Sequence, residues 1–150
     1  MEEQILEFLN KLSINNDSVT FEPEEGLLKI SLLVPEDRKG LLIGRRGETL
    51  ESIQLLISLM INNNKDRSQA TRILLDIAGY REERLAKILE KAEEIAAYVE
   101  KTGSPRSLPN LSSTERRQVH THFALSGKFT TYSQGEGDDR RLFISLSSPK

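Results

Sequence analysis

The chain opens with apolar residues at helical spacing and then places them at every second position. Residues 2–12 predict an amphipathic helix, which the polar run NND at 15–17 is expected to end. One face of this helix carries Ile5, Leu6, Phe8, Leu9 and Leu12. The segment SVTFE at 18–22 predicts a short strand. PEEG at 23–26 predicts a turn, because proline and glycine interrupt regular structure.

A second strand and two further helical segments follow. Apolar residues alternate in LLKISLLVP, which predicts a strand that pairs with the first; they are Leu28, Ile30, Leu32 and Val34. A short helical turn is expected in EDRKGLLIG, and a longer helix from Glu48 to about Asn62. This helix is apolar most of the way round, so we expect it to be well buried. Its apolar residues are Leu50, Ile53, Leu55, Leu56, Ile57, Leu59, Met60 and Ile61.

The third strand completes the first half of the chain. Ile73, Leu75 and Ile77 alternate in TRILLDIAG, so the predicted order up to this point is α-β-β-α-α-β. A boundary between two small units is expected near residues 78–81. We therefore predict one domain at 1–79 and another at 80–150.

The second half begins with the most regular helical pattern. Residues 80–102 carry an apolar stripe spaced three and four apart, and Gly103 suits the position just after the helix. SPRSLPNL is expected to be irregular or extended. Ser112-x-x-Glu115 has the spacing of a capping box, which predicts a helix start. FTTYSQ and RRLFISL predict a hairpin around GEGDD, with Leu142, Ile144 and Leu146 alternating on one side.

Composition and charge limit the function classes. The 150 residues include no cysteine, which excludes disulfides, thiolate metal ligands and a cysteine nucleophile, and fits a reducing cytoplasm. The N-terminus lacks the pattern of a signal peptide, and no apolar run reaches the roughly 20 residues of a membrane span. The net charge of −2 argues against a general polyanion binder, but residues 104–150 alone carry +3.

The segment Gly44-Arg45-Arg46-Gly47 combines features that favour an anion. Glycines let a backbone approach a ligand, a helix N-terminus offers unpaired N–H groups, and arginines suit phosphate. The alternative is a plain corner between two helices with solvated arginines.

The placement of this segment after two strands and before a third resembles a type II KH domain, a single-stranded nucleic-acid module. The matching residues are Ile43, Gly44, Arg45, Arg46, Gly47, Thr49, Leu50, Ile53 and Gln54. In that family the GxxG loop clamps the backbone of about four nucleotides, and the bases lie in an apolar groove beside it. The resemblance implies that Leu42, Ile43, Leu50 and Ile53 face either bases or the core.

A second group of residues lies in ERRQVH. Arg116 and His120 are four apart on the predicted helix and so share a face, which suits a phosphate or a base; the alternative is a solvated helix face. The segments LPNLSSTERRQVHTHFAL and TYSQGEGDDRRLFISL resemble the RxxxH domain, which also binds single-stranded polynucleotides. The resemblance implies that Arg116 and His120 are its signature pair. Ser133, Gly135 and Arg140 match its S-x-G-x-x-x-x-R segment, and GYRE at 79–82 also matches.

In this order the two modules resemble the bacterial Jag-type, or SpoIIIJ-associated, family. The expected fold class is therefore α+β, with a KH-like unit joined through a long helix to a small α/β unit. Many members carry an extra N-terminal domain, so this chain is expected to be either a short member or one from which that domain was removed.

Metal and enzyme functions are the weaker alternatives. His120 and His122 diverge by about 200° on a helix, so no metal site and no cofactor are expected. His120 as a base would need a partner and a nucleophile, and no spacing joins it to Ser112, Ser113 or Asp138.

The sequence therefore predicts a non-enzymatic protein that binds single-stranded nucleic acid, with RNA favoured over DNA. The predicted contacts are Ile43, Gly44, Arg45, Arg46, Gly47 and Thr49, together with Arg116, His120 and Arg140. The resemblance implies RNA-linked regulation of bacterial growth or envelope assembly, with a second small KH protein or a second copy as partner. The alternative is a protein-interaction or dimerisation module that reuses KH-like surfaces.

Overall fold

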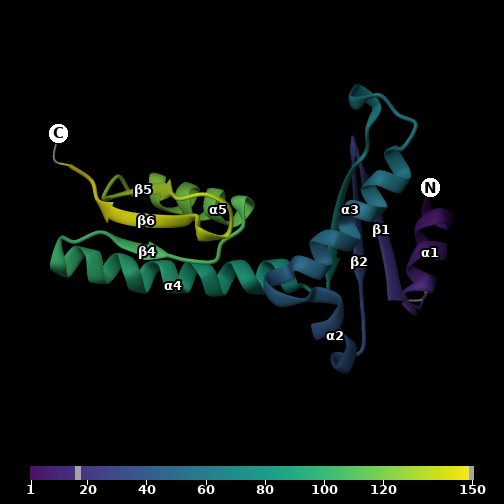
Figure 1. Cartoon of the computed structure of the whole chain (residues 1–150), viewed down its shortest axis with the longest axis horizontal. Coiled ribbons are helices and arrows are strands. Elements are labelled where there is room, and N and C mark those ends of the chain that lie inside the picture. The colour runs from purple at the N-terminus through teal and green to yellow at the C-terminus, as the bar shows by residue number, and fades with distance from the viewer. Residues whose placement is uncertain (16–17, 149–150) are drawn as a thin grey trace. The chain divides into compact units, whose positions relative to one another are not determined.

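The structure is a computed structural model that describes residues 1–15 and 18–148. It divides into two compact units, Met1–Arg81 and Glu82–Lys150. Each unit has its own three-stranded sheet and its own core, so each is described by itself (Figure 1). The predicted α+β class is confirmed, as is the order α-β-β-α-α-β of the first unit.

The sheet of the first unit mixes antiparallel and parallel pairing. Its strands are β1 (Val19–Glu24), β2 (Leu27–Leu32) and β3 (Arg72–Ile77), in the order β1-β2-β3. β1 runs antiparallel to β2, and β3 runs parallel to it with Leu75 beside Ile30. The turn predicted at 23–26 is shorter than expected, because Pro23 lies within β1. An edge strand tolerates proline, since the missing N–H can face away from the ladder.

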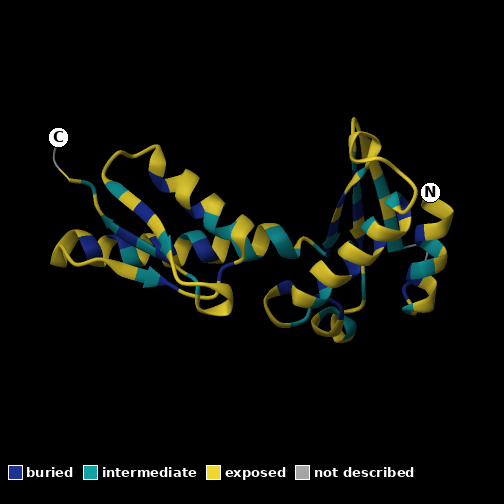
Figure 2. Cartoon of the chain, turned by 45° about the horizontal axis from the view of Figure 1, so that its top comes forward, coloured by how far each residue is buried: buried dark blue, intermediate teal, exposed yellow. Residues whose placement is uncertain are grey.

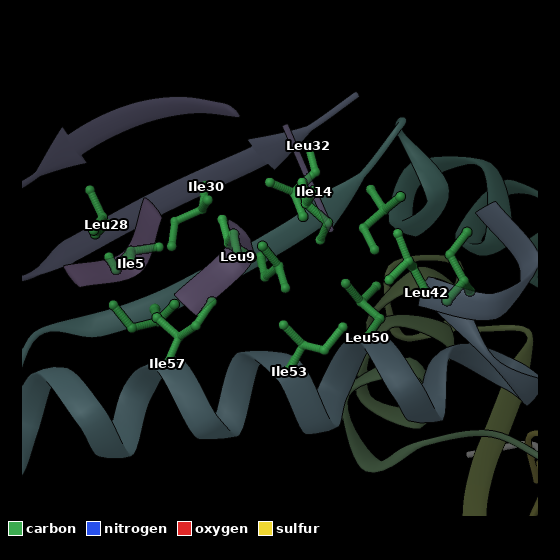
Figure 3. Close-up of a cluster of buried hydrophobic side chains, with 14 of the residues drawn as sticks. Ile5, Leu9, Ile14, Leu28, Ile30, Leu32, Leu42, Leu50, Ile53 and Ile57 are labelled. Atoms are coloured by element: carbon green, nitrogen blue, oxygen red, sulfur yellow. The ribbon is translucent and has the colours of Figure 1, made fainter. Parts of the chain in front are cut away.

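Three helices cover one face of this sheet. They are α1 (Glu2–Lys11), α2 (Glu36–Ile43) and α3 (Glu48–Asn62). Figure 3 shows Leu50, Ile53 and Ile57 pointing from α3 towards the strands, where they join Ile5 and Leu9 of α1. The alternating residues of β2 and β3 complete this core; they are Leu28, Ile30, Leu32, Ile73, Leu75 and Ile77. Of the NND run that was expected to end the first helix, Asn16 and Asp17 lie outside the described residues.

The prediction that α3 is buried most of the way round is wrong. Four of its apolar side chains are exposed, which are Leu55 (59%), Leu56 (53%), Leu59 (59%) and Met60 (36%). The sheet covers only the face that carries Leu50, Ile53, Ile57 and Ile61, because a helix on a single sheet has one covered side (Figure 2).

The second unit is built on a long helix and an antiparallel sheet. The helix α4 (Tyr80–Thr102) starts with the last two residues of the first unit, and Gly103 follows it with φ +71° as predicted. The strands β4 (Arg106–Leu108), β5 (Phe129–Gln134) and β6 (Arg141–Leu146) lie in the order β4-β6-β5. The extended alternative for SPRSLPNL therefore holds at β4, which pairs with β6.

The helix α5 (Ser113–Ala124) starts at the predicted capping box. The Ser112 hydroxyl accepts the Glu115 N–H, and the Glu115 carboxylate accepts the Ser112 N–H. Both helices contribute to one core with the strands, whose buried members are Ile88, Ala92, Ala96, Leu108, Leu111, Val119, Phe123, Leu142 and Ile144. Leu146 was expected on the same side of the hairpin but is 38% exposed, because β6 ends there beyond the helices' cover.

Candidate functional site

The GxxG segment forms a tight turn between α2 and α3. Gly44 (φ +72°), Arg46 (φ +53°) and Gly47 (φ +83°) all have left-handed backbones. A β-carbon on Gly44 would lie 2.9 Å from the backbone nitrogen of Thr49, and one on Gly47 would lie 3.1 Å from Cε1 of Tyr80. Both positions therefore need glycine for conformation and for space.

The two arginines of this turn stand outside the core. Arg45 and Arg46 are exposed, and Nη2 of Arg46 lies 3.9 Å from the Glu48 carboxylate at the start of α3. No side chain caps the N-terminus of α3 within the described part of the chain. Its N–H groups and the two guanidinium groups together favour an anion at this turn.

The apolar residues around the turn belong to the core. The sequence left open whether Leu42, Ile43, Leu50 and Ile53 face bases or the interior, and all four are at most 8% exposed. Ile43 therefore supports the turn from within. Thr49 is half-buried and lies against Gly44.

A hollow of about 400 Å³ lies between α5 and the hairpin of the second unit. From α5 it is lined by Ser113, Arg116, Arg117 and His120. From the hairpin it is lined by Thr131, Tyr132, Ser133, Arg140 and Leu142. The fold thus brings Arg140 to the same hollow as Arg116 and His120, although it is 20 residues further along the chain than His120.

Each of these three predicted contacts is held by a hydrogen bond to its surroundings. Nη1 of Arg116 donates to the carbonyl of Leu111 (2.7 Å), and Nη1 of Arg140 donates to the carbonyl of Gly135 (2.9 Å). Nδ1 of His120 bonds to the hydroxyl of Thr131 on β5, which leaves Nε2 as the second polar atom of the ring. The side chains are thereby partly ordered before any ligand arrives.

The turn that carries Arg140 depends on Gly135. Its φ is +95°, and a β-carbon there would lie 2.8 Å from the carbonyl oxygen of Asp139. This close approach brings the end of the turn back to its start. The glycine and the arginine in the S-x-G-x-x-x-x-R spacing are therefore two parts of one structure.

The sequence did not single out every residue of the hollow. Arg117 is adjacent to Arg116 and exposed, so its place in the RR pair was the available signal. Thr131 is 8% exposed, and nothing in the sequence marks its hydroxyl as the partner of His120.

The GYRE segment lies against the KH-like unit. Arg81 donates from Nε to the carbonyl of Leu75 (2.8 Å), from Nη1 to Glu51 (2.7 Å) and from Nη2 to Gln54 (2.9 Å). Gly79 donates its N–H to Asp76. The residues that resembled part of the RxxxH module thus support α3 and the end of β3.

The two histidines of α5 contact different elements. His120 meets Thr131 on β5, whereas Nε2 of His122 lies 2.6 Å from the Glu93 carboxylate of α4. No cluster of three histidine, cysteine or acidic side chains suited to a metal occurs within residues 1–15 and 18–148. None of the helices described combines the length and apolar character that a membrane crossing needs.

Comparisons with known proteins match both units. A model of the KhpA/KhpB KH domain family matches residues 2–73, and a model of the RxxxH domain matches residues 86–146. A KH domain followed by an RxxxH domain is the class of protein that this fold defines. The chain belongs to the KhpB, or Jag-type, family of proteins that combine these two domains.

Curated relatives from this family have longer chains. The RNA-binding protein KhpB of Clostridium symbiosum is 34% identical over 151 residues, which cover 97% of this chain and 66% of that protein. KhpB of Bacillus subtilis (strain 168) is 34% identical over 113 residues, covering 73% of this chain and 52% of that protein. KhpB of Lactiplantibacillus plantarum is 31% identical over 109 residues, covering 73% and 33%. The chain thus spans one to two thirds of the length of these relatives.

Proposed function

We propose that this chain is a non-enzymatic binding protein for single-stranded nucleic acid, with RNA favoured over DNA. The relatives' name, RNA-binding protein, supports RNA as the ligand. The observation that carries the proposal is the hollow of the second unit. Three arginines and a histidine converge there beside serine and threonine hydroxyls, which suits a phosphate and its sugar.

The GxxG turn is proposed as a second contact, which clamps the backbone of the strand. Its glycines leave the backbone open to a close approach, and Arg45 and Arg46 supply charge for phosphates. Ile43 and Thr49 contribute by holding the turn on the core rather than by reaching far into solvent.

The test is fluorescence anisotropy with labelled single-stranded RNA and DNA of equal length. We expect Arg45→Asp/Arg46→Asp and Arg116→Ala/His120→Ala each to weaken RNA binding by about tenfold or more, since several phosphate contacts are lost. Arg67→Asp/Lys101→Asp makes the same change in net charge as the loop variant, at exposed positions outside both sites. It is expected to bind more nearly as the native chain does.

Three outcomes would contradict parts of the proposal. Binding of neither strand by the native chain at low salt would reject it entirely. Loss in the loop variant alone would remove the hollow from the site. Slow RNA cleavage that His120→Ala abolishes would favour the hydrolase alternative.

The cellular role is proposed from family resemblance. It would be RNA-linked regulation of growth or envelope assembly, because the chain belongs to the Jag-type family. Sequencing of the RNA that co-purifies with the native chain, but not with the doubly substituted loop and hollow variant, would test it. Enrichment of no transcript over the variant would contradict the role.

A specific observation favours protein interaction as a second candidate function. Leu55, Leu56, Leu59 and Met60 form an exposed apolar face on α3, outside the face that it buries. Such faces on small domains commonly bind proteins. The proposed partner is a second copy or a second small KH protein.

A further inference from the structure

The sheet of the second unit has one covered face and one open face. Buried side chains at alternate positions, Leu108, Thr131, Leu142 and Ile144, point to the side where α4 and α5 pack. Residues between them point the other way. Tyr132 and Phe143 lie on this opposite side, and neither belongs to the core formed with the helices.

Tyr132 and Phe143 form a stacked aromatic pair on the open face. They are register partners on β5 and β6, which lie side by side in Figure 1. Their ring centroids are 5.4 Å apart and the ring planes differ by 6°. Tyr132 is 38% exposed, so one of two parallel rings is available to a further flat group.

The open face is continuous with the hollow. Tyr132 lines the hollow together with its neighbours Thr131 and Ser133, and β5 is the edge strand beside it. Arg140 lines the hollow, and the next residue, Arg141, is exposed and alternates onto the face of Phe143. Cationic side chains therefore stand on both sides of the path between the hollow and the ring pair.

The charges of the hairpin also give the path a direction. Glu136, Asp138 and Asp139 occupy the turn between β5 and β6 and are exposed, so they repel phosphates. Away from the turn, the ring pair is followed by the uncharged pair Thr130 and Ser145. A strand leaving the hollow is favoured across Tyr132 and towards that pair.

We propose that the open face of this sheet is a base-stacking surface. A single strand whose phosphate lies in the hollow places a neighbouring base on the Tyr132–Phe143 pair. This inference rests on the proposed function and extends it, because the hollow accounts for phosphate and sugar contacts and the ring pair for a base. Aromatic side chains on open sheets stack bases with little sequence preference.

The experiment compares two strands that differ only in their bases. A labelled single-stranded adenosine 12-mer and an abasic strand with the same number of phosphates are titrated against the full chain. We expect Tyr132→Ala to weaken binding of the adenosine strand about tenfold, as loss of one stacked base does, and to leave binding of the abasic strand unchanged. Tyr132→Phe keeps the ring and is expected to bind as the native chain does.

A matched control separates stacking from a general effect of losing a tyrosine. Tyr98→Ala removes a tyrosine that is 42% exposed on α4 and packs under Arg106, outside this sheet face. It is expected to change neither affinity. Circular dichroism and thermal melting of each variant show that the second unit stays folded.

The outcomes distinguish this inference from the function beneath it. If the native chain binds the adenosine strand and Tyr132→Ala binds it equally well, the stacking surface is wrong and the proposed function stands. Equal losses on the adenosine and abasic strands would also overturn it, since the tyrosine would then act through the fold or the hollow. A changed oligomeric state in Tyr132→Ala would assign the face to a protein contact instead. If the native chain binds no strand, both proposals fail.

Discussion

At the scale of single residues, glycines determine where both proposed contacts can form. Gly44, Gly47 and Gly135 each combine a left-handed backbone with a neighbour that a β-carbon would crowd. Gly26 and Gly137 have positive φ as well, but a β-carbon on either would meet nothing within 4 Å. Conformation alone therefore favours glycine at the second group, whereas close packing also requires it at the first.

Gly135→Ala is predicted to disturb the hollow more than Gly137→Ala does. Both changes strain a positive φ, at about 1–2 kcal/mol each, but only the first drives a methyl group against the Asp139 carbonyl. We expect Gly135→Ala to lower the free energy of unfolding further, as measured in urea. RNA binding should fall with it, because Arg140 bonds to the Gly135 carbonyl. Equal stability and equal affinity in the two variants would contradict this account.

At the scale of elements, α3 and the start of α4 have two functions each. α3 packs Leu50, Ile53 and Ile57 on the sheet, while other apolar side chains on it remain exposed. Arg81 belongs to α4, yet its three side-chain bonds go to Leu75, Glu51 and Gln54. This explains why the compact first unit extends to Arg81. The predicted boundary after Gly79 would separate Arg81 from these partners.

The exposed face of α3 is predicted to mediate association. Leu56→Lys/Leu59→Lys places charge at its centre and is expected to abolish self-association in sedimentation equilibrium, since burial of two lysines is unfavourable. The fold should be unaffected, because both side chains already face solvent.

A leucine outside this face provides the control for that prediction. Leu125→Lys changes a side chain that is 89% exposed, and association should persist. A native chain that stays monomeric at all concentrations, alone and with a second small KH protein, would show that the face has another role.

At the scale of the whole molecule, two separate sites on one chain predict a dependence on strand length. Once a strand is long enough to reach both the GxxG turn and the hollow, the second contact forms at a high effective concentration. We expect the affinity to rise in a step as RNA is lengthened, and the salt dependence to steepen with it, because more phosphates are neutralised.

Removing either site should abolish that step. Arg45→Asp/Arg46→Asp and Arg116→Ala/His120→Ala are each expected to show a gradual change of affinity with length and a shallower salt dependence. Isothermal titration over a series of RNA lengths measures both quantities. A step that persists in either variant would mean that the two sites do not share one strand.

The sequence by itself determined the elements and the residue types at the proposed contacts. Alternation marked β2, β3 and β6, the Ser112–Glu115 spacing marked the start of α5, and GxxG and RxxxH marked two segments rich in cations. These signals are local, because helix periodicity, strand alternation and capping depend on residues only a few positions apart.

Only the tertiary structure decided which side chains share a surface. It brought Arg140 and Thr131 to the hollow of Arg116 and His120, and placed Ile43 in the core. It left part of an apolar helix uncovered and paired Tyr132 with Phe143 on an open face. The physical reason is that burial depends on what packs against an element, and those neighbours come from distant parts of the chain.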